Sequence, residues 1–176
     1  MALDIVGNRT MRDLLDEQVE RQVDKTFLVF ENREGEISET SYREFQSRVE
    51  ALACGFWELG IRQGDAVTVY LANSPEILET WFALGSIGAL MVPSNIANTV
   101  PELTYVLEFS GSIAVVTEPR FLDTVTEAAD AVPAVRHRIL ARTDETVEGT
   151  MLLSSVRAAA ASRPVVLVDS GDVVPR

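Results

Sequence analysis

The stretch from Gly64 to Asn95, GDAVTVYLANSPEILETWFALGSIGALMVPSN, most constrains the fold because it reads as strand, helix and second strand. The run AVTVYLA is apolar and of strand length. Ser74 and Pro75 then supply the N-cap and the first residue of a helix. The run ALMVPSN predicts the next strand. A unit of this kind, with apolar strands, predicts a parallel sheet covered by helices.

The same alternation continues on both sides of this unit. Ser41 and Glu44 form a capping box ahead of an apolar helical stripe, and Thr99 and Glu102 form a second box ahead of a helix that ends at Gly111. The runs SIAVVTE and HRILAR predict two more strands. The predicted fold class is therefore α/β, a largely parallel sheet with flanking helices.

Less regular segments complete the expected order. They are a helix over 11–23, strands over 26–32 and 36–41, a polar loop over 142–149, a helix over 151–161 and a strand or tail over 164–176. The helix that starts at Pro75 is apolar on more than one face, which predicts burial between the sheet and another layer. Gly85 and Gly88 are costly within a helix, so we expect a neighbouring element to approach closely there.

Charge and composition exclude several classes of partner. The formal net charge of −12 argues against binding to nucleic acid and to an anionic membrane surface. The longest nearly apolar run, Trp81 to Val92, is too short to span a bilayer, and the N-terminus lacks the features of a signal peptide. Cys54 is the only cysteine, which excludes an internal disulfide and fits a reducing compartment. We therefore expect a cytoplasmic protein in which Cys54 serves packing.

Motifs that would carry chemistry are absent from the 176 residues. Neither usual glycine-rich phosphate loop occurs, and no nucleophile elbow is present. His137 is the only histidine and sits in an ordinary strand position, while the only lysine, Lys25, reads as a surface residue. Acidic residues are not grouped at metal-ligand spacing. We therefore assign no catalytic residue, no cofactor-binding residue and no metal ligand to this chain.

Polar residues that follow predicted strands are the remaining candidates for contact with a substrate. Asn73 and Ser74 follow one strand, and Ser94 and Asn95 follow the next, with Asn98 close behind. Ligands of open α/β sheets bind beyond the carboxyl ends of the strands. Capping and turn formation explain the same residues without a ligand.

Several sequence segments, in their order along the chain, resemble the opening region of the adenylate-forming (AMP-binding) enzymes. This superfamily includes acyl-CoA synthetases, aryl-CoA ligases, luciferases and peptide-synthetase adenylation domains. The pieces that carry the resemblance, in the family's order, are SYREF, LGIRQGDAVTVYLANSPE, GALMVPSN and ELTYVLEFSG. LDIVGNRTMRDLLDEQ, KTFLVFE and WFALGSIGALMVP look most like the crotonobetaine/carnitine–CoA ligase branch. The resemblance covers residues 3–120 and fades towards the C-terminus.

The resemblance implies a two-step ligase. A small carboxylic acid and Mg-ATP would give an acyl-adenylate and pyrophosphate, and the thiol of CoA would then take the acyl group. The family's phosphate loop, its adenine and ribose motifs and its C-terminal catalytic lysine have no match here, and Lys25 matches no catalytic lysine. Residues 1–176 are therefore expected to be a single incomplete domain, inactive alone, whose first partner is the remainder of its own chain.

Two alternatives remain open at this stage. The chain could be a stand-alone binding or oligomerising module that reuses the scaffold and covers an exposed apolar surface by forming homo-oligomers. It could also belong to another adenylating enzyme, such as one that loads a peptide synthetase. The sequence does not identify the carboxylic acid.

Overall fold

The computed structural model describes residues 9–159, and a parallel sheet of five strands lies at its centre. The strand order is β4-β3-β5-β6-β7, and every neighbouring pair runs parallel. The strands are β3 (Ala66–Tyr70), β4 (Leu90–Pro93), β5 (Ser112–Thr117), β6 (His137–Leu140) and β7 (Met151–Leu152). The α/β fold class predicted from the sequence is confirmed.

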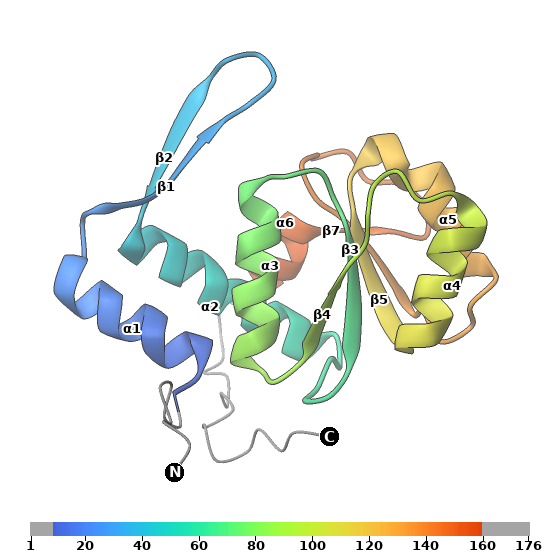
Figure 1. The fold of residues 1–176 in the computed structure, drawn as a ribbon, viewed down its shortest axis with the longest axis horizontal. Helices are drawn as coiled ribbons and strands as arrows, with labels where there is room; N and C mark the ends of the chain where they lie inside the picture. The colour runs from blue at the N-terminus through green and yellow to red at the C-terminus, as the bar shows by residue number, and fades with distance from the viewer. Residues whose placement is uncertain (1–8, 160–176) are drawn as a thin grey trace, which may run out of the picture.

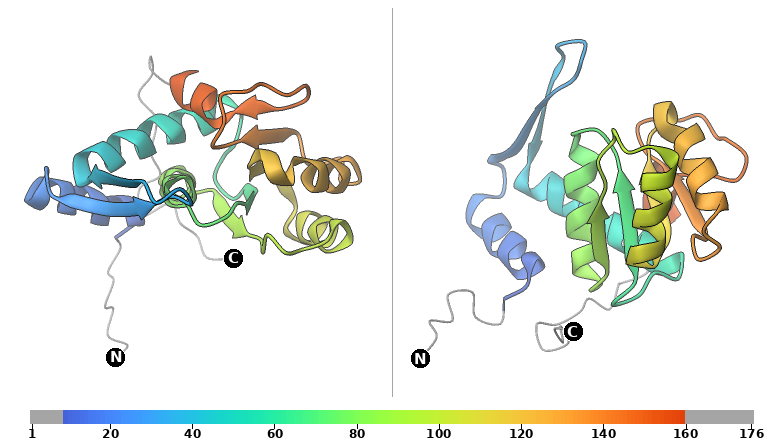
Figure 2. Two further views of the ribbon diagram at one scale, coloured as in Figure 1. Left: turned by 90° about the horizontal axis from the view of Figure 1, so that it is seen from above. Right: turned by 45° about the vertical axis from the view of Figure 1, so that its right-hand side comes forward.

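Helices cover both faces of this sheet (Figures 1 and 2). The helices are α1 (Met11–Gln22), α2 (Tyr42–Glu58), α3 (Pro75–Ser86), α4 (Val100–Ser110), α5 (Leu122–Asp130) and α6 (Leu153–Ala159), with a short 3₁₀ turn at Pro119–Phe121. One apolar core joins α2, α3 and α6 to the sheet around Phe45 and Phe56, both fully buried. A second core joins α4 and α5 to the opposite face around Leu103 and Val125.

A two-stranded hairpin projects from this layered body (Figure 1). It consists of β1 (Thr26–Glu31) and β2 (Ile37–Ser41), which pair antiparallel. It leads directly into α2 through Ser41. The hairpin strands and the helix over 11–23 were predicted from the sequence, and the structure confirms them to within two residues.

Both predicted capping boxes are present. The Glu44 carboxylate accepts hydrogen bonds from the backbone N–H of Ser41 at 2.8 Å and from its hydroxyl at 2.9 Å. The Glu102 carboxylate does the same for Thr99, at 2.7 Å for both bonds. These contacts explain why the helices begin where the sequence places them.

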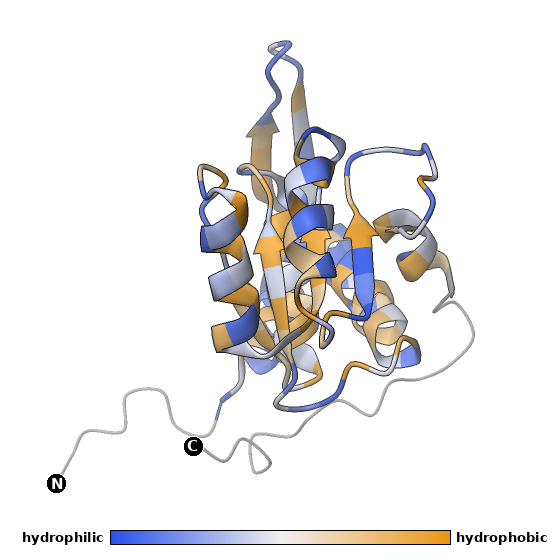
Figure 3. Cartoon of the chain, turned by 90° about the vertical axis from the view of Figure 1, so that its right-hand side faces the viewer, coloured by the Kyte–Doolittle hydropathy of each residue, from blue (hydrophilic) through white to orange (hydrophobic). Residues whose placement is uncertain are grey.

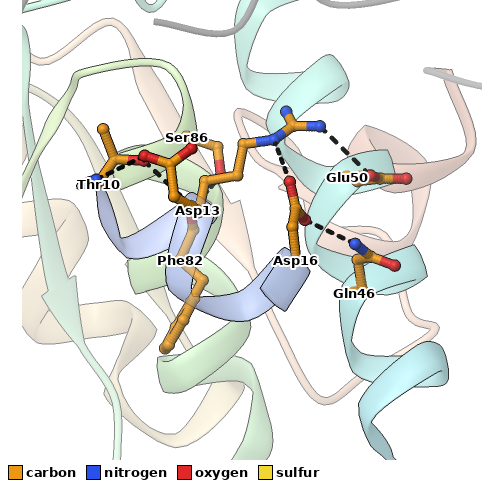
Figure 4. A network of polar contacts seen from close by, with 8 residues as sticks. Thr10, Asp13, Asp16, Gln46, Glu50, Phe82 and Ser86 are labelled. Carbon is orange, nitrogen blue, oxygen red and sulfur yellow. Dashed lines mark hydrogen bonds and ion pairs between the residues drawn. The ribbon is translucent and has the colours of Figure 1, made fainter. Parts of the chain in front are cut away.

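Helix α1 is held against α2 by a polar network (Figure 4). The Arg12 guanidinium lies 3.1 Å from Asp16 and 3.5 Å from Glu50. Gln46 donates to the other oxygen of Asp16 at 2.6 Å. These contacts supplement a narrow apolar interface, since Leu15 is the only buried residue of α1.

Among the described residues, no helix has both the length and the apolar character needed to cross a bilayer.

The close approach expected at Gly85 is not found, because a Cβ there would meet the Met11 sulfur only at 3.9 Å, an ordinary contact distance. Gly88 lies beyond the end of α3 in a left-handed turn with φ of 70°, and a close approach there stays a prediction. The tight contact is at Gly55, where a Cβ would stand 2.1 Å from the carbonyl oxygen of Val156. Helix α6 therefore rests directly on the backbone of α2, a long-range contact that helical periodicity alone does not reveal.

One further expectation differs from the structure. Met151 and Leu152 were expected to open a helix, but they pair with β6 as the edge strand β7, and the helix begins at Leu153. Helix α3 packs between the sheet and helices α1 and α2, as its apolar faces predict, although Trp81 is 46% exposed. Strand β4 forms the other edge of the sheet and exposes Leu90. Residues 160–161 of the expected last helix and the expected strand or tail over 164–176 lie outside the described residues.

Candidate functional site at the carboxyl edge of the sheet

The carboxyl ends of the central strands meet at one edge of the sheet. Tyr70 of β3 pairs with Thr117 of β5, and Thr117 pairs with Leu140 of β6. Pro93 ends β4 beside Val69. The segments that follow all four strands are therefore neighbours, as expected for a parallel sheet.

The predicted candidates Ser94 and Asn95 lie at this edge and shape a turn. Asn98 donates to the Ser94 hydroxyl at 3.1 Å, and the Asn95 side-chain oxygen accepts from Ala97 N at 2.9 Å. The Tyr70 hydroxyl lies 2.8 Å from the carbonyl oxygens of both Ile96 and Asn98 and can donate to either. Burial, with a smaller contribution from the nearby Glu102 charge, raises the pKa of Tyr70, so the hydroxyl stays a donor. The turn is thus fixed, and contact of Ser94 or Asn95 with a ligand stays a prediction.

The other predicted pair, Asn73 and Ser74, lies between β3 and α3. Asn73 is exposed. Ser74 occupies the N-cap position of α3 but makes no side-chain capping bond, and its hydroxyl oxygen is buried with no hydrogen-bond partner. Asn73 and Ser74 are brought to the same edge as Ser94 and Asn95, and their contact with a ligand also stays a prediction.

A buried carboxylate, Glu118, ties three strand ends together at this edge. One oxygen accepts from the backbone N–H of Ala72 at 3.1 Å and from Arg120 at 2.8 Å. The other oxygen lies 3.6 Å from the Arg142 guanidinium, and the side chain is only 8% exposed. Segments after β3, β5 and β6 are therefore held by one charged group, which two arginines compensate.

Arg142 adopts a backbone conformation that is uncommon for its residue type. Its φ is 62°, and no other non-glycine residue described between positions 9 and 159 has a positive φ. Its guanidinium lies 5.9 Å from the ring of Phe30 and so reaches from the sheet edge towards the hairpin. Left-handed conformations at non-glycine residues cost energy and concentrate at functional sites. The conformation of Arg142 therefore supports the carboxyl edge of the sheet as a candidate functional site.

A second buried carboxylate, Glu79 of α3, joins three helices. Its side chain is 3% exposed, and its oxygens pair with Arg48 of α2, at 3.3 Å, and with Arg157 of α6. Removal of either arginine would leave the carboxylate underpaired in a buried position, which is unfavourable. Glu79 therefore helps to hold α6 on α2 and α3.

A cleft of about 460 Å³ opens between these helices and the hairpin. A smaller hollow of about 290 Å³ adjoins it and shares Glu76, Arg142 and Arg157 as lining. The charged lining of the larger cleft balances in sign, with three arginines and three glutamates: Arg48, Arg142, Arg157, Glu36, Glu76 and Glu79. The cleft is of ligand size but has no charge bias towards an anion or a cation.

Catalytic groups do not gather here. His137 begins β6 and so lies at the opposite end of that strand, and burial lowers its pKa. Lys25 is exposed in the turn after α1 and donates to Gln22 at 2.7 Å. Cys54 is half-buried on α2. Within residues 9–159, no group of histidine, cysteine and acidic side chains is arranged to hold a metal ion.

Residues 15–174 match the AMP-binding enzyme family. The chain belongs to the AMP-binding enzyme family. It is 39% identical over 119 residues to a crotonobetaine/carnitine–CoA ligase of Salmonella paratyphi A, and 38% identical over the same length to one from Salmonella typhi. The resemblance to that branch is thereby confirmed. The match covers 68% of this chain and 23% of the Salmonella paratyphi A ligase, so the chain spans about a quarter of that relative's length.

Solved structures of AMP-binding enzymes share the fold. An anthranilate CoA ligase in complex with anthranoyl-AMP superposes with a TM-score of 0.78 at 20% identity, covering 86% of this chain and 28% of that one. Acetoacetyl-CoA synthetase from Streptomyces lividans gives a TM-score of 0.78 at 20% identity, covering 91% and 26%. In both, the region resembling this chain is a minor part of a larger enzyme.

Sequence reasoning missed the charged residues of this AMP-binding domain's sheet edge. Glu118 and Arg142 directly follow the apolar runs of β5 and β6. The rule that selected Asn73 and Ser94 would therefore have found them, had it been applied to charged as well as neutral polar residues. Glu79 and Arg157 carry no local signal, since only the packing of α3 and α6 brings them together.

Proposed function

We propose that this chain is the N-terminal part of an ATP-dependent acyl-CoA ligase. The parent would join a small carboxylic acid to CoA through an acyl-adenylate, with release of AMP and pyrophosphate. The observation that carries this proposal is the 39% identity to a crotonobetaine/carnitine–CoA ligase together with the match of residues 15–174 to the AMP-binding enzyme family. ATP, Mg²⁺ and CoA are the reactants and cofactor of the parent enzyme.

We propose further that the chain is inactive alone and supplies scaffold. Transfer of an adenylyl group needs cationic and N–H donors around the phosphates and a metal ion on the leaving group. Within residues 9–159, no group of three or more histidine, cysteine and acidic side chains could hold the metal ion. The arginines beside the sheet edge and the cleft are already paired, Arg48 and Arg157 with Glu79 and Arg120 and Arg142 with Glu118. The chemical groups would therefore come from the remainder of the parent chain, within the cytoplasm. Nucleic acid and membranes are not among the proposed partners.

The test compares the 176-residue chain with a chimaera. In the chimaera, residues 1–176 replace the corresponding opening part of the Salmonella paratyphi A ligase. Both are assayed for pyrophosphate release and acyl-CoA formation with Mg-ATP, CoA and a panel of acids that includes crotonobetaine, carnitine and fatty acids. We expect turnover by the chimaera only. Pyrophosphate release by the short chain would contradict the scaffold role.

A second candidate function is a stand-alone oligomerising module, and one observation favours it. Tyr105 and Phe109 of α4 are 62% and 81% exposed, and their rings stack with centroids 5.6 Å apart. Large contiguous apolar patches mark interaction surfaces, and this aromatic pair would form part of one in the stand-alone module. Sedimentation of the 176-residue chain decides the matter: a defined dimer that Phe109→Ser dissociates would support the module, and a monomer at all concentrations would reject it.

A further inference from the structure

Helices α4 and α5 form an outer layer on one face of the sheet, opposite α2, α3 and α6. They pack against each other and against the core around Leu103 and Val125. The hairpin, helix α1 and the larger cleft lie on the side of α2 and α3 (Figures 1 and 2). Figure 3 looks onto the outer layer and shows hydrophilic segments along both helices. The outer layer is therefore a surface separate from the cleft.

One side of α4 presents an aromatic pair to solvent. Tyr105 and Phe109 are 62% and 81% exposed, and their rings stack with centroids 5.6 Å apart and 19° between their planes. Glu102 and Glu108 are exposed on the same side of the helix, because each stands three residues from Tyr105. Two carboxylates therefore flank the two rings.

The neighbouring helix adds further negative charge. All three exposed residues of α5 are acidic, and their spacing places them on one side of the helix: Asp123, Glu127 and Asp130. Asp130 pairs with Arg138, whereas Glu108, Asp123 and Glu127 take part in no ion pair of the described residues. Neither α4 nor α5 contains a lysine or an arginine, whereas α1, α2 and α6 each contain at least one arginine. The outer layer thus combines exposed rings with carboxylates that lack a cationic partner.

This combination identifies the chemistry of a partner. Neither cleft described above is lined by residues of α4 or α5, and small ligands bind in concave sites. The carboxylates repel anionic membranes and nucleic acid. In a symmetric contact with a second copy, the same carboxylates would face each other, which is unfavourable. A polypeptide with arginine and apolar side chains complements both features, because guanidinium groups pair with carboxylates and pack on aromatic rings.

We propose that the outer layer of α4 and α5 is a docking surface for a basic, amphipathic polypeptide segment of a partner protein. Apolar side chains of the partner cover the aromatic pair of α4, and its arginines or lysines pair with Glu108, Asp123 and Glu127. Aromatic residues contribute most of the binding energy of such contacts, while charge pairs chiefly set the association rate and the salt dependence. The proposal uses only surface residues of the described chain, so it stands independently of the ligase reaction.

Two synthetic peptides test the charge requirement. Both form an amphipathic helix with the same leucine stripe, which is flanked by arginines in one peptide and by glutamates in the other. Each peptide carries a fluorophore and is titrated with the 176-residue chain. We expect the arginine peptide to bind, with an affinity that falls as the salt concentration rises, and the glutamate peptide not to bind. Equal binding of the two peptides, or no binding of the arginine peptide at low salt, would overturn the proposal.

Matched variants locate the contact, because a chain with a net charge of −12 attracts any cationic peptide weakly. Phe109→Ser should weaken binding of the arginine peptide by roughly tenfold or more, whereas Trp81→Ser, at an exposed aromatic residue of α3, should not change it. Glu127→Gln should weaken binding by about two- to threefold and reduce its salt dependence. Glu20→Gln removes the same charge from an exposed position of α1 and should have a smaller effect. Melting temperatures confirm that each variant is folded. Equal losses for a variant and its control would mean unspecific attraction and would overturn the proposal.

Three further measurements test other occupants of the outer layer. In sedimentation, a dimer that forms without peptide and that Phe109→Ser dissociates would assign the layer to a second copy. The folded chimaera should bind the arginine peptide with unchanged affinity, and loss of binding there would assign the layer to the remainder of the chain. Binding to vesicles of anionic lipid that Phe109→Ser abolishes would assign it to a membrane. Each of these assignments overturns the proposal.

Discussion

Strand β1 of the hairpin and strand β3 at the centre of the sheet are both apolar runs, but they stand in opposite environments. All five residues of β3 are buried, whereas no residue of β1 is. Strand β3 has a hydrogen-bonded neighbour on each side and helices above and below. Strand β1 has only β2. The apolar run TFLVFE thus forms a strand in which no residue is fully buried.

The difference distinguishes the main sheet, which residues 9–159 cover with their own helices, from the hairpin, whose outer strand edges are open in that range. Parallel strands need cover on both faces, and helices within residues 9–159 provide it for the main sheet. Within that range the hairpin is covered only at its base, where the Phe27 ring packs against Tyr42 and Phe45 of α2. Substitutions in the two regions should therefore differ sharply in their effect on the free energy of unfolding.

The largest effect is expected in the main core. Phe56→Ala removes a fully buried ring and should lower the free energy of unfolding by about 3–5 kcal/mol. Val29→Ala in the hairpin should change it by no more than about 0.5 kcal/mol, because Val29 is 61% exposed. Urea denaturation followed by circular dichroism measures both. Similar losses for the two variants would break the comparison.

A smaller effect is expected at the contact between α2 and α6. Gly55→Ala places a methyl group against the Val156 carbonyl and should cost about 1–3 kcal/mol, because the neighbour is backbone and cannot rotate away. Gly85→Ala is the control, since only the flexible Met11 side chain is near, and it should stabilise α3 by about 0.5–1 kcal/mol. If both variants gain stability, α6 does not pack as described.

Ser74→Ala should hardly change the free energy of unfolding. An N-cap serine replaced by alanine ordinarily costs about 1 kcal/mol. The Ser74 hydroxyl makes no capping bond and has no partner, so we expect a change of at most about 0.5 kcal/mol. Thermal unfolding of the variant checks this, with Ser41→Ala as the control that does lose capping bonds. A loss for Ser74→Ala equal to that of the control would mean that Ser74 caps α3 in solution.

The smallest expected effect is on the stability of the protein at acidic pH. The backbone and hydroxyl of Thr99 hold the pKa of Glu102 below its ordinary value of 4.5. The folded protein therefore binds this proton less tightly than the unfolded chain, so the stabilisation is complete above pH 4.5 and is lost as the pH falls through the folded value. Glu102→Gln keeps an acceptor but does not titrate. Melting temperatures from pH 7 to pH 3 should fall slightly less steeply for this variant; an unchanged slope would contradict the assignment.

Much of the fold was predictable because its signals are local. Capping boxes at Ser41 and Thr99, the left-handed glycine at Gly111 and the apolar runs of β3 and β5 each depend on residues close together in the sequence. The edge strand β7 was missed because two residues carry no periodicity, and its pairing with Ile139 and Leu140 decides its conformation.

The site was predictable only in part. The rule for parallel sheets correctly placed Asn73, Ser74, Ser94 and Asn95 at one edge, since strand ends are a local feature. The clamp on Glu79 was not predictable, because it joins α2, α3 and α6, which are far apart in the sequence. No alternation of polar and apolar residues encodes which arginine meets which glutamate.

The contact between Gly55 and Val156 also sets an order of events during synthesis. Helix α2 is synthesised well before α6, so Gly55 has no Val156 to contact until α6 has emerged from the ribosome. The apolar side of α2 is exposed until then, and transiently exposed apolar surface is what chaperones bind in general. The core around α2 can pack completely only after α6 has emerged. A nascent chain arrested before Leu153 should therefore remain protease-sensitive in α2. This helix precedes the main sheet in the sequence, but it is fully packed only when α6 is present.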